Sequence, residues 1–251
     1  MNLTNPFNLT ARTAFISGSS RGIGRAIAFA LGCAGARVIF HGVAESAAME
    51  KTLAEADEQN IAHDIIYGDL GDASATQKIA DALTHIDILV LNASTQTYMT
   101  LENFDVATYE KIADTNLRSS FMLVSALAPK MAARNWGRII SIGSVNQSSP
   151  APRLCAYAAT KAAQHNLILT CAKTYAASGV TANTISPGVI RTDRNAAALS
   201  DPAFAETLRT AIPANRFGAP EDCAGIALAL ASDACAYITG ADIPVDGGML
   251  I

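Results

Sequence analysis

The chain has 251 residues, of which 50% are hydrophobic and 16% charged, and its formal net charge is −4. No apolar stretch approaches the roughly 18 residues that a membrane-spanning helix needs, which excludes a transmembrane protein. The mild acidity, without a basic run, argues against nucleic acid as the main partner. A soluble protein large enough to bury a substantial core is therefore predicted.

The N-terminus and the cysteines both favour a cytoplasmic protein. The first 15 residues lack the basic and apolar regions of a signal peptide. The cysteines are odd in number, and no two form a CxxC pair, so we expect reduced thiols and no metal site. These cysteines are Cys33, Cys155, Cys171, Cys223 and Cys235.

Short strands rich in Val and Ile alternate with stretches of helical spacing along the whole chain. The predicted strands are Thr13–Ser17, Arg37–Phe40, Asp64–Tyr67, Ile86–Leu91, Arg138–Ile142, Thr181–Ile185 and Ile243–Val245. The predicted helices are Gly22–Cys33, Ala47–Glu58, Ala73–Leu83, Tyr109–Arg134, Ala156–Ala177 and Glu221–Ala231. This alternation predicts an α/β fold, a single Rossmann-like doubly wound parallel sheet of about seven strands flanked by helices.

No linker or repeat divides the chain, so we expect one domain over residues 1–251. The segment 189–219 interrupts the alternation of strands and helices and contains weakly predicted helices at Asp193–Leu199 and Pro202–Ala211. An insertion of this length in an α/β domain is typical of a substrate lid.

A glycine-rich turn joins the first strand to the first helix. It reads Ser17-Gly18-Ser19-Ser20-Arg21-Gly22-Ile23-Gly24. Glycines at these positions permit a tight turn and a close approach of the backbone to a ligand, and the helix N-terminus offers free N–H groups to a pyrophosphate. Three glycines can also simply make a turn, but their place between strand and helix favours dinucleotide binding.

A second motif places a tyrosine and a lysine on one helical face. Tyr157 and Lys161 are four residues apart, and Ser144 lies 13 residues before Tyr157, at the carboxyl end of the fifth strand. A neighbouring ammonium favours the phenolate and lowers the tyrosine pKa, as a general acid or base requires. Ligands bind at this edge of such sheets, so the Ser144 hydroxyl would face them.

Taken together, these motifs resemble those of the short-chain dehydrogenase/reductase family over essentially the whole chain. The resemblance implies a catalytic tetrad of Asn116, Ser144, Tyr157 and Lys161. It also implies a cofactor site formed by Gly18, Ser20, Arg21, Gly22, Ile23, Gly24, Asp69, Leu70, Asn92, Ala93, Ser94, Tyr157, Lys161, Pro187, Gly188, Ile190 and Thr192. The C-terminal half is similar to 3-oxoacyl carrier-protein reductases.

The resemblance assigns each catalytic residue a role. Tyr157 would donate a proton to the carbonyl oxygen during reduction or take the hydroxyl proton during oxidation. Ser144 would stabilise the developing charge on that oxygen. Lys161 would lower the Tyr157 pKa and reach the nicotinamide ribose, and Asn116 would hold a water that links Lys161 to solvent. The nicotinamide would carry the hydride, and a homotetramer is expected.

Two departures from the family pattern bear on the cofactor. Ser94 stands where family members usually have glycine, which adds a side chain beside the expected cofactor path. The second strand ends without the carboxylate that commonly binds the ribose of NAD. Arg21, together with His41, would instead face a 2′-phosphate, although Val43 stands where many NADP enzymes carry a base. NADP (NADPH) is therefore favoured over NAD (NADH).

The sequence is compatible with several classes of substrate. Arg153, Arg191 and Arg194 flank the expected pocket, either as contacts for a substrate anion or as solvated loop charges. A 3-oxoacyl thioester, a small carbonyl compound and a sugar-type alcohol are all candidates. The helix after Ala156 offers few basic residues to an acidic carrier protein. A non-catalytic dinucleotide sensor or scaffold on the same fold is the alternative from another class.

Overall fold

A computed structural model describes residues 5–251, without the side chains of residues 197–199, so residues 1–4 of the predicted domain lie outside it. The described chain forms one parallel sheet of seven strands, as predicted, and their order is β3-β2-β1-β4-β5-β6-β7. The strands are β1 (Thr13–Ile16), β2 (Arg37–Gly42), β3 (His63–Tyr67), β4 (Ile88–Leu91), β5 (Gly137–Ile142), β6 (Val180–Pro187) and β7 (Asp242–Val245). The order reverses between β1 and β4, which is where such sheets bind dinucleotides.

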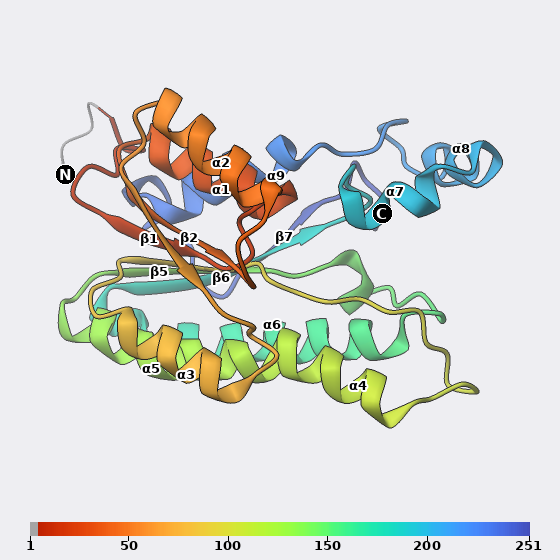
Figure 1. Ribbon diagram of the computed structural model, residues 1–251, viewed down its shortest axis with the longest axis horizontal. Helices are drawn as coiled ribbons and strands as arrows, with labels where there is room; N and C mark the ends of the chain where they lie inside the picture. The colour runs from red at the N-terminus through yellow and green to blue at the C-terminus, as the bar shows by residue number, and fades with distance from the viewer. Residues whose placement is uncertain (1–4) are drawn as a thin grey trace.

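Helices cover both faces of the sheet (Figure 1). One layer holds α1 (Gly22–Cys33), α2 (Ala47–Glu58) and α9 (Pro220–Ala231), and α1 packs closely against α9. The other layer holds α3 (Ala73–Ala82), α4 (Val106–Ala113), α5 (Ser119–Ala133) and α6 (Cys155–Tyr175). The lid segment forms α7 (Asp193–Leu199) and α8 (Pro202–Thr210), which extend to one side (Figure 1).

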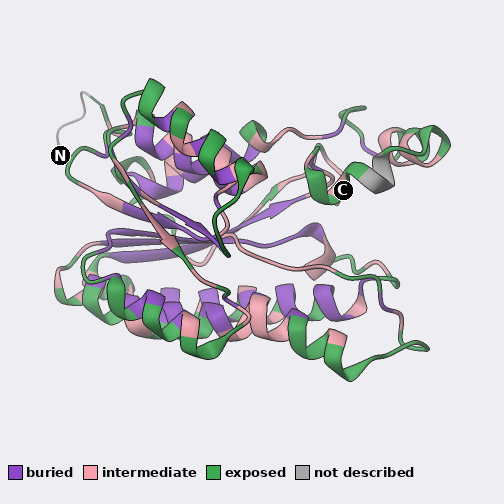
Figure 2. Cartoon of the chain, in the orientation of Figure 1, coloured by how far each residue is buried: buried purple, intermediate pink, exposed green. Residues whose placement is uncertain are grey.

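The strands form the buried centre of the molecule, as Figure 2 shows. Every residue of β4, β5 and β6 is buried, whereas the edge strands β3 and β7 consist of exposed and half-buried residues. One hydrophobic cluster lies under α1, α2 and α9, a second lies under α3, α5 and α6, and a third, smaller one contains Met99, Ile112 and Ala156. Burial on both faces explains the short runs of Val and Ile in the strands.

The predicted long helix Tyr109–Arg134 is divided in the structure. A π-helical turn at Asp114–Arg118 separates α4 from α5, and Asn116 lies buried within it. Such turns are rare and cluster at functional sites, because they disturb the regular hydrogen bonds of the helix. Hydrophobic spacing continues through the turn, so the sequence pattern does not reveal it.

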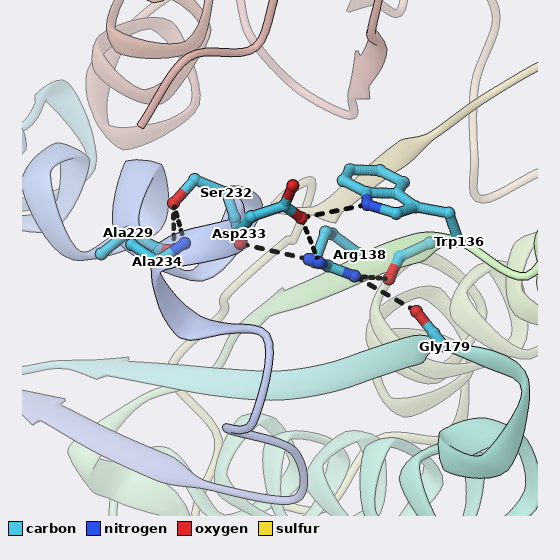
Figure 3. A network of polar contacts seen from close by, with 8 residues as sticks. Trp136, Arg138, Gly179, Ala229, Ser232, Asp233 and Ala234 are labelled. Carbon is cyan, nitrogen blue, oxygen red and sulfur yellow. Dashed lines mark hydrogen bonds and ion pairs between the residues drawn. The ribbon is translucent and has the colours of Figure 1, made fainter. Parts of the chain in front are cut away.

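An arginine at the start of β5 ties the sheet to the end of α9 (Figure 3). Arg138 is 2% exposed, and its guanidinium donates to the carbonyls of Ser232 and Gly179 and pairs with Asp233 at 2.8 Å. Trp136 stacks on this guanidinium and donates to the same carboxylate. A buried charge needs such partners, so the network fixes the edge of the sheet opposite the candidate site.

The described residues contain neither a membrane-spanning helix nor a metal-binding cluster. No helix among them is long and apolar enough to cross a membrane. They contain no group of three metal-ligating side chains, and all the cysteines are free thiols.

Candidate active site

The glycine turn after β1 forms a cradle closed on one side by Asn92. Gly18 and Gly22 adopt positive φ angles of 65° and 58°, which favour glycine. A Cβ at Gly24 would lie 2.4 Å from Asn92 Nδ2 and 2.5 Å from the Gly18 oxygen. The backbone here therefore has no room for a side chain.

The N-terminus of α1 is open to an anion. Its N-cap, Arg21, makes no capping side-chain hydrogen bond, and the first turn carries no acidic residue. The free N–H groups at Gly22, Ile23 and Gly24 and the helix dipole suit a pyrophosphate. The carbonyl of Ser20 is held from the other side by the Thr52 hydroxyl.

The segment after β4 anchors this cradle. The Asn92 amide donates to the carbonyls of Ser17 and Gly18, both at 2.9 Å. The Ser17 hydroxyl in turn accepts from the backbone N–H groups of Asn92 and Ala93. The predicted cofactor residues on β1 and β4 are thus brought together by direct hydrogen bonds.

His41 does not take the predicted place beside a 2′-phosphate. It is 2% exposed, and its ring joins the Gly18 N–H at 3.0 Å and the Gly68 carbonyl at 3.1 Å. Burial lowers the pKa of His41 to about 4, so the ring is neutral at physiological pH. A neutral ring with both nitrogens engaged holds the cradle and offers no charge to a phosphate.

Arg21 remains accessible beside the cradle. Its guanidinium lies 3.2 Å from Asp193 of α7, and both side chains are mostly exposed. Thr192, the N-cap of α7, approaches within 3.4 Å of a Cβ built at Gly22. The lid therefore begins directly against the phosphate cradle.

The remaining predicted cofactor residues line the same edge of the sheet. Asp69 is exposed after β3 and accepts from the Gly71 N–H, while Leu70 is buried. Pro187 ends β6, and the Gly188 N–H donates to the Val245 carbonyl. Ile190 is 2% exposed and pairs with Gly218 across the base of the lid.

Ser144 is oriented by its neighbour Asn146. It caps the short 3-10 turn Val145–Gln147 after β5, and its Oγ accepts from the Asn146 backbone N–H at 3.1 Å and from the Asn146 amide at 3.3 Å. A hydroxyl has two acceptor sites and one donor. Its proton is therefore left to donate, and the phenol of Tyr157 lies within hydrogen-bonding reach.

Burial dominates the electrostatics around Tyr157. Burial raises the pKa of the phenol, and the opposing effects of the Arg194 charge and of hydrogen bonds to Ser144 and Arg194 are smaller. Lys161 Nζ lies 5.9 Å from the centre of the tyrosine ring. Its own pKa is lowered to about 7 by burial and by Arg194. Desolvation therefore outweighs the groups that lower the Tyr157 pKa, and the effect of Lys161 on that pKa stays a prediction.

Lys161 is held from two elements. Its ammonium donates to the Ile142 carbonyl at 2.6 Å and to Gln164 Oε1 at 3.0 Å. Asn116 lies nearby, where its amide donates to the carbonyl of Thr95 and the hydroxyl of Thr160 and accepts from the Thr95 N–H. The structure thus assembles the four predicted catalytic residues at one edge of the sheet.

The lid contributes a cation to this edge. Arg194 of α7 donates to the Ser94 carbonyl at 2.7 Å, and its positive charge acts to lower the pKa of Tyr157. Arg153 lies over the rings of Tyr98 and Phe204, at 5.0 Å and 5.1 Å, and so joins the body to α8. Of the three candidate anion contacts, Arg194 is the one that reaches the tyrosine.

Gln164 and Asn146 orient Lys161 and Ser144, roles that the sequence patterns do not predict. Gln164 stands three residues after Lys161, a spacing that places both on one helical face. This spacing is the sequence feature that could have indicated a contact between Gln164 and Lys161. The turn of Asn146 back onto Ser144 depends on tertiary geometry and left no comparable signal.

Comparison with known protein families gives a match over nearly the whole chain. A family model described as enoyl-(acyl carrier protein) reductase matches residues 18–250. The rhamnolipids biosynthesis 3-oxoacyl-[acyl-carrier-protein] reductase of Pseudomonas aeruginosa is 37% identical over 250 residues, which cover 96% of this chain and 97% of that protein.

Solved structures of similar proteins share the fold. A 3-oxoacyl (acyl-carrier-protein) reductase from Agrobacterium tumefaciens C58 with NADP bound is 42% identical, with a TM-score of 0.93 over 99% of this chain and 98% of that chain. A gluconate 5-dehydrogenase from Burkholderia cenocepacia J2315 in complex with NADP and tartrate is 33% identical, with a TM-score of 0.91 over 97% of each chain.

Proposed function

The chain belongs to the short-chain dehydrogenase/reductase family of oxidoreductases, and on this premise we propose that it transfers a hydride between NADP(H) and a small ketone or secondary alcohol, with Tyr157 as general acid or base. The observation that carries the proposal is the convergence of Ser144, Tyr157 and Lys161 at the carboxyl edge of the sheet. That edge also carries the phosphate cradle.

The chain's own residues suit a dinucleotide. The cradle excludes a Cβ at Gly24, and the uncapped start of α1 leaves its N–H groups free for a pyrophosphate. Thr192 and Gly188 are the residues that would hold the nicotinamide end of the cofactor. When bound, the nicotinamide supplies or accepts the hydride.

The proton is handled by three side chains. Ser144 directs its hydroxyl toward the substrate oxygen, because Asn146 fills its acceptor sites. Tyr157 gives the proton to that oxygen in reduction and takes it in oxidation. Burial keeps Tyr157 protonated, which suits proton donation to a carbonyl. A charge-assisted donor such as Lys161 stabilises the phenolate that remains.

The preference for NADP over NAD rests on Arg21. Positions 41–44 at the end of β2 carry no carboxylate for a ribose hydroxyl, and the Arg21 guanidinium is mostly exposed beside the cradle. NADP bound to related structures supports this choice. A 2′-phosphate would compete with Asp193 for Arg21.

Among the substrate classes, we favour a small compound with a carboxylate, such as a sugar acid. Arg194 brings a positive charge to the Tyr157 hydroxyl, where an anionic group of the substrate would meet it. Within α6, Lys161 is buried, so Lys173 is the lysine that remains for an acidic carrier protein. A 3-oxoacyl thioester is the second candidate, supported by the reductases that resemble this chain.

We further propose one domain with residues 189–219 as the substrate lid and a homotetrameric, cytoplasmic protein. The contacts of Arg153, Arg194 and Arg21 across the site support the lid. Fully exposed Tyr237 and Ile251 near the C-terminus offer apolar surface for an interface. A monomeric mass by light scattering would contradict the tetramer.

The experiment is a parallel titration with NADPH and NADH followed by nicotinamide fluorescence, then turnover assays. D-Gluconate with NADP⁺ tests the sugar acid, D-glucitol is its neutral control, and acetoacetyl-CoA with NADPH tests the thioester. We expect tighter binding of NADPH and turnover of gluconate that Arg194→Met removes. Binding of NADPH without turnover of any compound in a broad panel of carbonyls and alcohols would favour the non-catalytic sensor.

A further inference from the structure

A buried line of hydrogen-bonded polar groups begins at the Lys161 ammonium. Gln164 Oε1 accepts from the Lys161 ammonium at 3.0 Å, and Gln164 Nε2 donates to the Ser120 hydroxyl at 2.8 Å. The Ser120 hydroxyl in turn donates to the Asn116 carbonyl at 2.9 Å. The four side chains are between 0% and 2% exposed.

Each group in this line has one role that chemistry permits. An ammonium can only donate, so the oxygen of the Gln164 amide must face Lys161 and its NH₂ must face Ser120. The hydroxyl of Ser120 then accepts a hydrogen bond from Gln164 and donates one to the Asn116 backbone carbonyl. The line runs from α6 through α5 into the π-helical turn without a break.

The donors of Lys161 can be counted. Its ammonium has three N–H groups, of which one is taken by the Ile142 carbonyl and one by Gln164. The third is left for the cofactor ribose. Without Gln164, the lysine chain could rotate about its flexible stem, and two N–H groups would need partners in a dry site.

We propose that Gln164 is a positioning residue that aims the Lys161 ammonium at the cofactor and couples it through Ser120 to the Asn116 carbonyl. The inference rests on the proposed function, because it takes NADPH as the ligand. In this arrangement the side chains of Gln164 and Ser120 connect Lys161 to the backbone carbonyl of Asn116.

The coupling has an electrostatic consequence. Burial and the charge of Arg194 both lower the pKa of Lys161, to about 7, while Tyr157 beside it stays neutral. The Gln164 carbonyl opposes this effect because it hydrogen-bonds the charged form. Loss of one charge-assisted hydrogen bond corresponds to a shift of about one pKa unit.

The test measures the NADPH dissociation constant as a function of pH by fluorescence in the full-length protein. Gln164→Met keeps the length of the side chain and removes the acceptor oxygen, so the alkaline loss of binding should begin about one pH unit lower than in the wild type. Gln164→Glu supplies a charged acceptor and should move the loss of NADPH binding to higher pH. Cys171→Ala, a buried change further along α6, is the control and should leave the pH of the transition unchanged.

Equal transitions in the wild type and Gln164→Met, or shifts of both Gln164 variants in the same direction, would overturn the inference. Ser120→Ala should shift the transition in the same direction as Gln164→Met but by less. If the pH of the transition is unchanged in Ser120→Ala, the coupling does not extend through Ser120 to Asn116. Failure of the wild type to bind NADPH at any pH would instead overturn the proposed function.

Discussion

Replacing Gly24 with alanine should damage the cofactor cradle while leaving the fold intact. The new Cβ would lie 2.4 Å from Asn92 Nδ2 and 2.5 Å from the Gly18 oxygen, far inside contact distance. The Asn92 amide would have to withdraw and lose its hydrogen bonds to Ser17 and Gly18. The backbone that meets the pyrophosphate would then shift.

The magnitude follows from these two hydrogen bonds. Each is worth about 1 kcal/mol, so the cradle loses about 2 kcal/mol, equivalent to a roughly 30-fold weaker binding of NADPH. Helix propensity acts in the opposite direction, because alanine is favoured over glycine in a helix by up to about 1 kcal/mol. The free energy of unfolding should therefore fall by only about 1 kcal/mol.

Gly225→Ala is the matched control. Gly225 lies within α9, and a Cβ there meets nothing within 4 Å. This variant should be as stable as the wild type or more so, with unchanged affinity for NADPH. Fluorescence titration gives the affinities and urea unfolding the stabilities. If Gly24→Ala bound NADPH within about threefold of the wild type, the steric reasoning would be refuted.

Three further changes probe the site. Tyr157→Phe should abolish turnover but keep NADPH affinity, and substantial remaining turnover would exclude Tyr157 as the proton donor. Arg21→Ala should weaken NADPH binding more than NADH binding. The control Asp193→Asn frees Arg21 from its ion pair and should not weaken NADPH binding. Equal losses of affinity for both cofactors in Arg21→Ala would show that Arg21 does not contact the 2′-phosphate. Burial lowers the pKa of Lys161 to about 7 from its ordinary 10.5, so the unfolded chain binds more protons between these pH values and the stability of the wild type rises with pH there. Lys161→Met should flatten that rise in urea unfolding at about pH 7 and about pH 9, and an unchanged slope would contradict the buried state of the lysine.

Local patterns were sufficient to predict most of the fold. The strand–helix alternation predicted the parallel sheet and helix boundaries close to those observed, because burial on both faces leaves continuous apolar strands. The π-helical turn around Asn116 was missed, since helical spacing is nearly the same on both sides of it.

The amino-acid sequence is enough to identify the chemical groups of the site and their places along the chain: the glycines of the cradle, and Tyr157 and Lys161 on one helical turn. The electrostatic state of the site depends on how the chain folds around it. His41 is neutral because β2 buries it between Gly18 and Gly68. The environment of Lys161 is likewise set by groups from β5, α6 and the lid. Desolvation and long-range contacts set these properties, and neither is encoded in the spacing of neighbouring residues.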